Sequence, residues 1–173
     1  MKTHKKNKTL KNKCIFLFGY GSLMNDYSRM KTHKKHRKKY PTLISKEFGY
    51  KRKWNTMIPN NKLVLGIEKN KKSNTPINGI LFKVCLCCIK NFLEREKRYN
   101  LKKINRKHIT FIKDMPKDFN KLNVYTFVTK NKFNNSLKKK KTLKIPKYYK
   151  NIINKSFKHY DKDFKKMFLK TTQ

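Results

Sequence analysis

The chain has 173 residues, with 48 Lys and Arg against 9 Asp and Glu, which gives a formal net charge of +39. This length fits one domain with a real hydrophobic core, and the charge favours either a polyanionic partner or a solvated basic surface without a dedicated partner. No segment approaches the ~20 apolar residues of a membrane span, and the apolar run behind the N-terminus is too short for a signal peptide, so we expect a cytoplasmic protein with no membrane partner.

The N-terminal part of the chain is strongly basic. Residues 1–13 have the composition of a disordered tail, so we expect a single folded domain over 14–173. The hexapeptide Met-Lys-Thr-His-Lys-Lys occurs at 1–6 and again at 30–35, where it leads into a basic cluster at 34–39. Such a cluster resembles a nuclear-localisation signal, but in a lysine-rich protein it favours a solvated loop.

The stretch Phe18-Gly19-Tyr20-Gly21-Ser22-Leu23-Met24 is the most informative in the chain. It follows a short apolar run at 14–17 that predicts a buried strand, and it holds two of the chain's 5 glycines. A strand that ends in a glycine-rich turn exposes backbone N–H groups to small anions, because glycine has no Cβ to block their approach. The stretch therefore predicts either a plain tight turn or one wall of a ligand site.

The middle and the end of the chain have different patterns. Strand-like segments lie at 62–67, 77–84 and 123–128, and one or two more are expected within 101–112. From Pro146 on, apolar residues recur at helical spacing and predict one or two amphipathic helices: Ile152, Ile153, Phe157, Tyr160, Phe164 and Phe168. Strands first and helices last indicate an α+β domain around a mixed or antiparallel sheet.

Four cysteines are present, and three of them are close together in sequence. Cys85 and Cys88 have the C-x-x-C spacing of zinc and redox sites, but no second pair of ligands has a matching spacing. The alternative is a group of small buried residues after a strand. We therefore expect no metal and no structural disulfide framework.

Two of the nine acidic residues lie in the basic segment 91–101. One interpretation is that Glu94 and Glu96 balance Arg95, Lys97 and Arg98 on a solvated helix end. The other is that one of the two carboxylates performs chemistry.

The order of these segments resembles that of the γ-glutamylcyclotransferase superfamily, which includes the ChaC-type glutathione-degrading branch and the avirulence-induced-gene-like plant proteins. The resemblance covers roughly residues 14–172. Its segments are the Tyr-Gly-Ser-Leu loop at 20–23, Ser28-Arg29, the aromatic–Arg–Trp strand at 49–54, central strands at 65–67 and 78–84, the Leu-x-x-Arg-Glu-x-x-Tyr segment that ends at Tyr99, and a closing helix at 146–149 and 164–172. The resemblance implies a small mixed or antiparallel β-barrel with flanking helices and no cofactor.

The resemblance also implies an enzyme of the carbon–nitrogen lyase or acyl-transfer type. The α-amine of a small γ-glutamyl substrate would attack its own γ-amide carbonyl, form 5-oxoproline and release an amine or amino acid. Because that amine is protonated at neutral pH, a base is needed, and the glutamate of the family in this role matches Glu96. The substrate would be a γ-glutamyl amino acid, a γ-glutamylamine or glutathione.

The remaining site residues are implied in the same way. Gly19, Tyr20, Gly21, Ser22 and Leu23 would hold the substrate through the turn, and Tyr99 and Tyr149 would hydrogen-bond it.

The basic neighbours of Glu96 bear on its chemistry. Arg95, Lys97 and Arg98 would tend to lower its pKa, whereas burial would raise it. Lys97 and Arg98 stand where the ChaC branch commonly has two glycines, which weakens an assignment to glutathione. The alternative function is a binding module without catalysis, in which basic and aromatic residues such as those at 147–150 contact nucleic acid or another polyanion.

Overall fold

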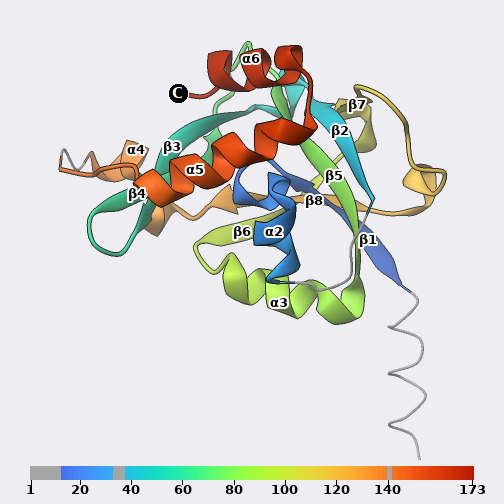
Figure 1. Ribbon diagram of the computed structural model, residues 1–173, viewed down its shortest axis with the longest axis horizontal. Coiled ribbons are helices and arrows are strands. Elements are labelled where there is room, and N and C mark those ends of the chain that lie inside the picture. Colours follow the sequence, from blue (N-terminus) through green and yellow to red (C-terminus); the bar gives the residue numbers. More distant parts are fainter. Residues whose placement is uncertain (1–12, 33–37, 140–141) are drawn as a thin grey trace, which may run out of the picture.

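The computed structural model describes residues 13–32, 38–139 and 142–173 (Figure 1). Residues 1–12 of the expected tail and most of the basic cluster at 34–39 lie outside these ranges. The strands are β1 (Cys14–Gly19), β2 (Lys39–Ile44), β3 (Tyr50–Ile58), β4 (Lys62–Lys69), β5 (Ile77–Cys85), β6 (Tyr99–Ile104), β7 (Ile109–Phe111) and β8 (Val124–Thr129). The helices are α2 (Asp26–Met30), α3 (Ile89–Arg95), α4 (Asn135–Lys138), α5 (Lys147–Ser156) and α6 (Lys162–Lys170).

Six strands form one mixed sheet in the order β6-β8-β1-β5-β2-β7. Only β1 and β8 run parallel, and the other neighbours are antiparallel. The two remaining strands, β3 and β4, form a separate antiparallel hairpin. The three strand-like segments read from the sequence correspond to β4, β5 and β8, so these predictions are confirmed.

The α+β class with flanking helices is confirmed, but the strands do not close into a barrel. Within the described residues, β6 and β7 are the two edges of the large sheet. The hairpin bonds instead to later parts of the chain: Trp54 N donates to Gln173 O at 2.8 Å, and Leu63 N donates to Lys144 O at 2.9 Å. These two bonds pair backbone groups of the hairpin with the C-terminal part of the chain.

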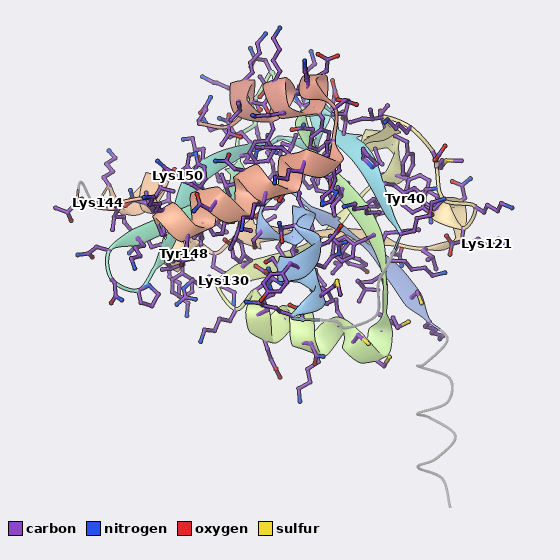
Figure 2. All side chains as sticks on the ribbon, in the orientation of Figure 1. Tyr40, Lys121, Lys130, Lys144, Tyr148 and Lys150 are labelled. Carbon is purple, nitrogen blue, oxygen red and sulfur yellow. The ribbon has the colours of Figure 1, made fainter. Side chains whose placement is uncertain are left out.

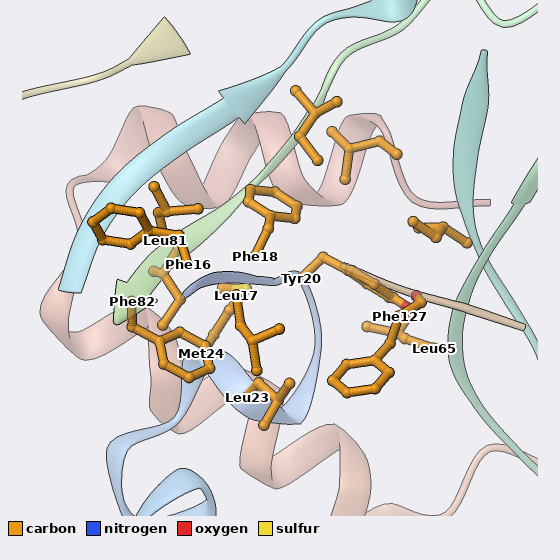
Figure 3. Packing of buried hydrophobic residues seen from close by; sticks show 14 of the residues in the cluster. Phe16, Leu17, Phe18, Tyr20, Leu23, Met24, Leu65, Leu81, Phe82 and Phe127 are labelled. Atoms are coloured by element: carbon orange, nitrogen blue, oxygen red, sulfur yellow. The ribbon is translucent and has the colours of Figure 1, made fainter. Parts of the chain in front are cut away.

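Gly66 marks where the hairpin packs against the large sheet. A Cβ at this position would lie 1.9 Å from Thr129 Oγ1 on β8 and 2.3 Å from Thr56 Oγ1 on β3. Only glycine therefore permits this close approach of β4 to β8. The apolar side chains of β1, β4, β5 and β8 fill the space around β1 (Figure 3).

The C-terminal helical pattern divides into two helices. The break falls at Asp161, whose side chain accepts a hydrogen bond from Phe164 N at 2.8 Å and so caps α6. Phe157 and Phe168 are buried and meet edge to face with ring centroids 5.0 Å apart. Figure 1 shows α5 crossing in front of the strands with α6 above it. Among the described helices, none has the length and apolar character needed to cross a membrane.

Arg52 connects β3 to the C-terminal segment. Its fully buried guanidinium donates to Asn78 O at 2.6 Å, Phe168 O at 3.0 Å, Thr171 Oγ1 at 3.0 Å and Thr172 Oγ1 at 2.7 Å. It also lies 3.6 Å from the centroid of the Phe168 ring. This one side chain joins the hairpin, β5 and the end of α6.

Basic side chains cover the surface on every side in view (Figure 2). At 147–150, the two adjacent tyrosines differ sharply: Tyr148 is 53% exposed, whereas Tyr149 is 8% exposed. Only Tyr148 is therefore accessible for stacking on a ligand at the surface.

Candidate active site

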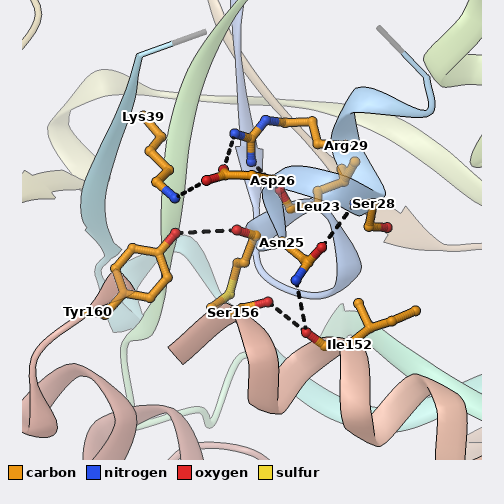
Figure 4. Close-up of polar contacts among 10 residues, drawn as sticks. Leu23, Asn25, Asp26, Ser28, Arg29, Lys39, Ile152, Ser156 and Tyr160 are labelled. Atoms are coloured by element: carbon orange, nitrogen blue, oxygen red, sulfur yellow. Dashed lines mark hydrogen bonds and ion pairs between the residues drawn. The ribbon is translucent and has the colours of Figure 1, made fainter. Parts of the chain in front are cut away.

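The glycine-rich turn runs from the end of β1 into the short 3-10 helix η1 (Ser22–Met24). Side chains from other elements hold its carbonyls in place (Figure 4). Leu23 O accepts from Arg29 Nη1 at 2.8 Å, and Met24 O accepts from the Tyr160 hydroxyl at 3.3 Å. Arg29 of α2 and Tyr160, which lies between α5 and α6, thus hold the turn in place. The turn is therefore a rigid wall of the site.

Asp26 keeps Arg29 in this position. Its carboxylate pairs with Arg29 at 2.5 Å and with Lys39 at 2.6 Å. Burial alone would raise the pKa of Asp26, but the hydrogen bonds from the two cations hold it below the usual range. The carboxylate therefore stays ionised at neutral pH and supports the turn.

Gly21 lies directly against Tyr149 from α5. A Cβ at Gly21 would lie 2.9 Å from the Tyr149 hydroxyl oxygen and 3.6 Å from Leu65 Cβ. Burial raises the pKa of Tyr149, and the nearby Glu96 adds to this effect. The hydroxyl therefore keeps its proton at neutral pH and can act as a hydrogen-bond donor beside the turn.

Glu96 caps the C-terminal end of α3, and its side chain is only 13% exposed. Burial raises the pKa of Glu96, and the ion pair with Arg95, with Nε 3.0 Å from Oε1, opposes the rise only in part. Both effects expected from the sequence act on this carboxylate: burial raises its pKa, and the basic neighbour Arg95 lowers it. Burial is the larger effect, and Lys97 is exposed to solvent.

Arg95 joins α3 to α2 and to η1. Its Nε donates to Glu96, Nη1 to Ser28 O and to Thr32 Oγ1 at 2.8 Å, and Nη2 to Ser22 Oγ at 3.0 Å and Ser28 Oγ at 2.9 Å. A guanidinium has five N–H donors, so these contacts use all of them. Arg95 therefore positions Glu96 and Ser22 and has no donor left for a ligand.

The two other tyrosines of the site donate to backbone carbonyls. The Tyr20 hydroxyl donates to Phe127 O at 2.6 Å, and the Tyr99 hydroxyl donates to Leu65 O at 2.7 Å. Burial raises the pKa of both groups well above the usual value. Both hydroxyl protons are already donated to these carbonyls, so each tyrosine oxygen can take part in a further hydrogen bond only as an acceptor.

These elements line a partly open cavity of about 160 Å³. All the site residues expected from the sequence line it except Gly19: Tyr20, Gly21, Ser22, Leu23, Glu96, Tyr99 and Tyr149. Gly19 lies just before the lining segment and packs closely on Leu23, whose Cβ would be 2.7 Å from a Cβ added at Gly19. The structure thus brings together segments that are more than a hundred residues apart in sequence.

The apolar wall was not anticipated. Phe18, Ile58, Val64, Leu65 and Phe127 complete the lining. Each lies in or beside a strand, where apolar side chains are expected in any core, so no sequence signal separates them from ordinary packing residues.

A scan of protein-family models finds no match to the sequence, and a search of curated proteins finds none at a significant level. Solved structures do match. YkqA from Bacillus subtilis aligns with a TM-score of 0.63 and 16% identity over 96% of this chain, which spans 56% of that protein. A gamma-glutamyl cyclotransferase aligns with a TM-score of 0.62 and 10% identity over 90% of this chain and 85% of that one. A yeast gamma-glutamyl cyclotransferase specific to glutathione aligns with a TM-score of 0.55 and 11% identity over 92% of this chain and 97% of that one.

The chain has the γ-glutamyl cyclotransferase-like fold. Within this fold, the two candidate carboxylates of the basic segment have different surroundings. The Glu94 side chain is 67% exposed and lies 4.0 Å from Lys90, one helical turn away. It matches the interpretation of a solvated helix end, whereas Glu96 lines the cavity.

Proposed function

We propose that this protein is a γ-glutamyl cyclotransferase. The observation that carries the proposal is a buried carboxylate, Glu96, whose raised pKa suits a general base and which shares a small cavity with the glycine-rich turn. The cavity of about 160 Å³ corresponds to about five water molecules at ~30 Å³ each. This size favours a small group such as a γ-glutamyl moiety.

The proposed reaction needs one base and a fixed substrate pose. Glu96 takes a proton from the α-ammonium group, and the freed amine attacks the γ-amide carbonyl of the same molecule. The new C–N bond closes 5-oxoproline as the old C–N bond breaks, and Glu96 returns the proton to the departing nitrogen. The second proton that the attacking nitrogen loses also ends on the departing amine, which leaves as an ammonium ion. Because attack is intramolecular, the rigid walls contribute mainly by holding the substrate folded.

The other polar groups fit the same pose. The Ser22 N–H donates to the Tyr149 oxygen, whereas the Leu23 N–H has no acceptor within that short helix by position and would bind the α-carboxylate or the developing oxyanion. The Tyr149 hydroxyl would donate beside it, and the oxygens of Tyr20 and Tyr99 would accept from the ammonium group.

Arg98 supports a narrower substrate class. It lines the cavity, its guanidinium lies 5.6 Å from the centroid of the Phe133 ring, and among the described residues no carboxylate forms an ion pair with it. An unpaired cation at a ligand site favours an anionic group. We therefore favour γ-glutamyl amino acids or peptides, whose departing half has a carboxylate, over γ-glutamylamines.

The test is release of 5-oxoproline from a panel of γ-glutamyl amino acids, γ-glutamylamines and glutathione. Glu96→Gln keeps the shape of the side chain and removes the base, so turnover should fall by ~10²-fold or more. Glu94→Gln is the matched control on the same helix and should leave turnover unchanged. Turnover that survives Glu96→Gln would refute the assigned role.

The binding-module alternative has its own outcome in this test. The exposed Tyr148 beside Lys147 and Lys150 offers one stacking residue in a basic setting. Absence of turnover on every substrate, together with RNA or DNA binding that weakens steeply with salt, would favour it over catalysis.

A further inference from the structure

Two cysteines that are far apart in sequence lie opposite each other on adjacent strands of the large sheet. Cys14 begins β1 and Cys85 ends β5, and the two residues are direct partners in the antiparallel ladder. The Cys14 Sγ lies 3.4 Å from the Cys85 Sγ. Both side chains are half-buried, so both sulfurs are partly accessible.

The hydrogen-bonding pattern identifies the type of pair. Leu86 N donates to Lys13 O at 2.8 Å, so the pair adjoining Cys14 and Cys85 is the hydrogen-bonded one. Cys14 and Cys85 therefore form a non-hydrogen-bonded pair, in which Cα atoms are about 4.5 Å apart. This lies inside the range of about 4.4–6.8 Å that disulfides span.

We propose that Cys14 and Cys85 are a modification site that forms a reversible disulfide on reaction with a low-molecular-weight disulfide such as oxidised glutathione. One cysteine thiolate attacks a sulfur of the reagent, forms a mixed disulfide and releases one glutathione thiolate. The second cysteine thiolate then attacks the protein sulfur of that mixed disulfide and releases the second glutathione. The two cysteines lose two electrons and two protons, and the reagent is reduced to two thiols.

The step requires little movement of the chain. The sulfurs must approach from 3.4 Å to a bond length of about 2.05 Å, which side-chain rotation can supply because the backbones are already paired. The bond would link β1, which leads into the glycine-rich turn, to β5, which leads through Cys87 and Cys88 into α3 and Glu96.

The other close pair of sulfurs is less suited to this bond. Cys87 and Cys88 have sulfurs 3.6 Å apart but are neighbours in sequence. A disulfide between adjacent residues closes a small ring that includes their peptide bond, and a planar trans peptide resists that closure. Cys87 is also exposed, and Cys85 and Cys88 are half-buried, so the interpretation of these cysteines as a buried group is wrong.

The experiment uses the full chain, reduced and then treated with excess oxidised glutathione, followed by mass spectrometry without reductant. We expect a mass lower by about 2 Da than that of the reduced chain, which is the loss of two hydrogens. Trypsin should release a peptide that begins at Cys14 linked to the peptide 84–90. Because 84–90 also contains Cys87 and Cys88, the double variant Cys87→Ser/Cys88→Ser assigns the bond.

The double variant should still lose about 2 Da and give the linked peptide. Cys14→Ser and Cys85→Ser should each abolish the link. The proposal is overturned if the double variant gives no link, if the link in the wild-type chain excludes Cys14, or if the product is a glutathione adduct that does not resolve.

Discussion

Replacing Gly21 by alanine tests whether the Tyr149 hydroxyl is held against the turn. The added Cβ would lie 2.9 Å from that oxygen, well inside the roughly 3.5 Å at which non-bonded atoms pack. Overpacking of this kind costs ~1–3 kcal/mol, and the reduced freedom of the unfolded chain offsets ~0.4–1 kcal/mol of it. Gly21→Ala should therefore lower the free energy of unfolding by ~1–2 kcal/mol.

A double-mutant cycle isolates this contact. Tyr149→Phe removes the oxygen, so Gly21→Ala should cost almost nothing in that background, and the coupling energy should be ~1–2 kcal/mol. Urea denaturation of the four proteins measures it. Tyr148→Phe is the matched control, because Tyr148 is the preceding residue on α5 and is 53% exposed. In that background the cost of Gly21→Ala should equal its cost in the wild type.

The reasoning is refuted if Gly21→Ala costs the same in the Tyr149→Phe background as with the native tyrosine. The turn would then tolerate or resist a methyl group for reasons unrelated to Tyr149. In that case the hydroxyl would not be placed to contact a substrate bound at the turn. The double-mutant cycle measures only the contact between Gly21 and Tyr149, so its result does not depend on whether the protein is an enzyme.

Three other results are expected. Because burial raises the pKa of Glu96, kcat/KM should fall on acidification at a pH above the ordinary carboxylate range. The same shift favours the protonated form of Glu96 in the folded state. The stability that this group contributes is therefore present at low pH and is lost as the pH rises through the folded-state pKa. Glu96→Gln should remove that loss, and urea denaturation at several pH values would show it. Arg52→Met should lower stability by ~3–5 kcal/mol, since it leaves several buried acceptors unpaired at ~1–3 kcal/mol each. The neighbouring, partly exposed Lys51→Met should change stability by less than ~0.5 kcal/mol, and equal effects in thermal unfolding would contradict the buried role. Arg98→Ala should lower kcat/KM by ~10-fold or more for γ-glutamylalanine but not for γ-glutamylethylamide, which differs only in lacking the alanine carboxylate; equal losses would place Arg98 at the γ-glutamyl half instead.

Much of the fold follows from local patterns. The apolar runs that became β1, β4, β5 and β8 are recognisable because buried strands concentrate apolar residues. β2 escaped prediction because it begins at Lys39, the last residue of the basic cluster, and contains Pro41. The pattern of hydrogen bonds that leaves the sheet open depends on contacts between the hairpin and the C-terminal segment, which no local pattern encodes.

The site was predictable only in part, for a similar reason. The glycine-rich turn and the pair Glu94 and Glu96 lie in short segments with unusual composition, so they stand out in sequence. Only the family resemblance selected Glu96 over Glu94. The role of Arg95 does not, because an arginine among lysines has the appearance of a solvated residue. Its partners Ser28 and Thr32 are more than sixty residues away in the chain, and only the folded structure shows that it is saturated.

The contacts of Arg52 also bear on how the chain is made. Its acceptor Thr172 is 120 residues further along the chain, which at 5–20 residues per second takes a ribosome roughly 6–24 s to synthesise. During that interval the guanidinium can reach Asn78 but not Phe168, Thr171 or Thr172. It must therefore stay partly hydrated, which opposes docking of the β3–β4 hairpin. We therefore expect the hairpin to be the last part of the sheet structure to settle on the nascent chain, and the part most in need of protection from aggregation until α6 arrives.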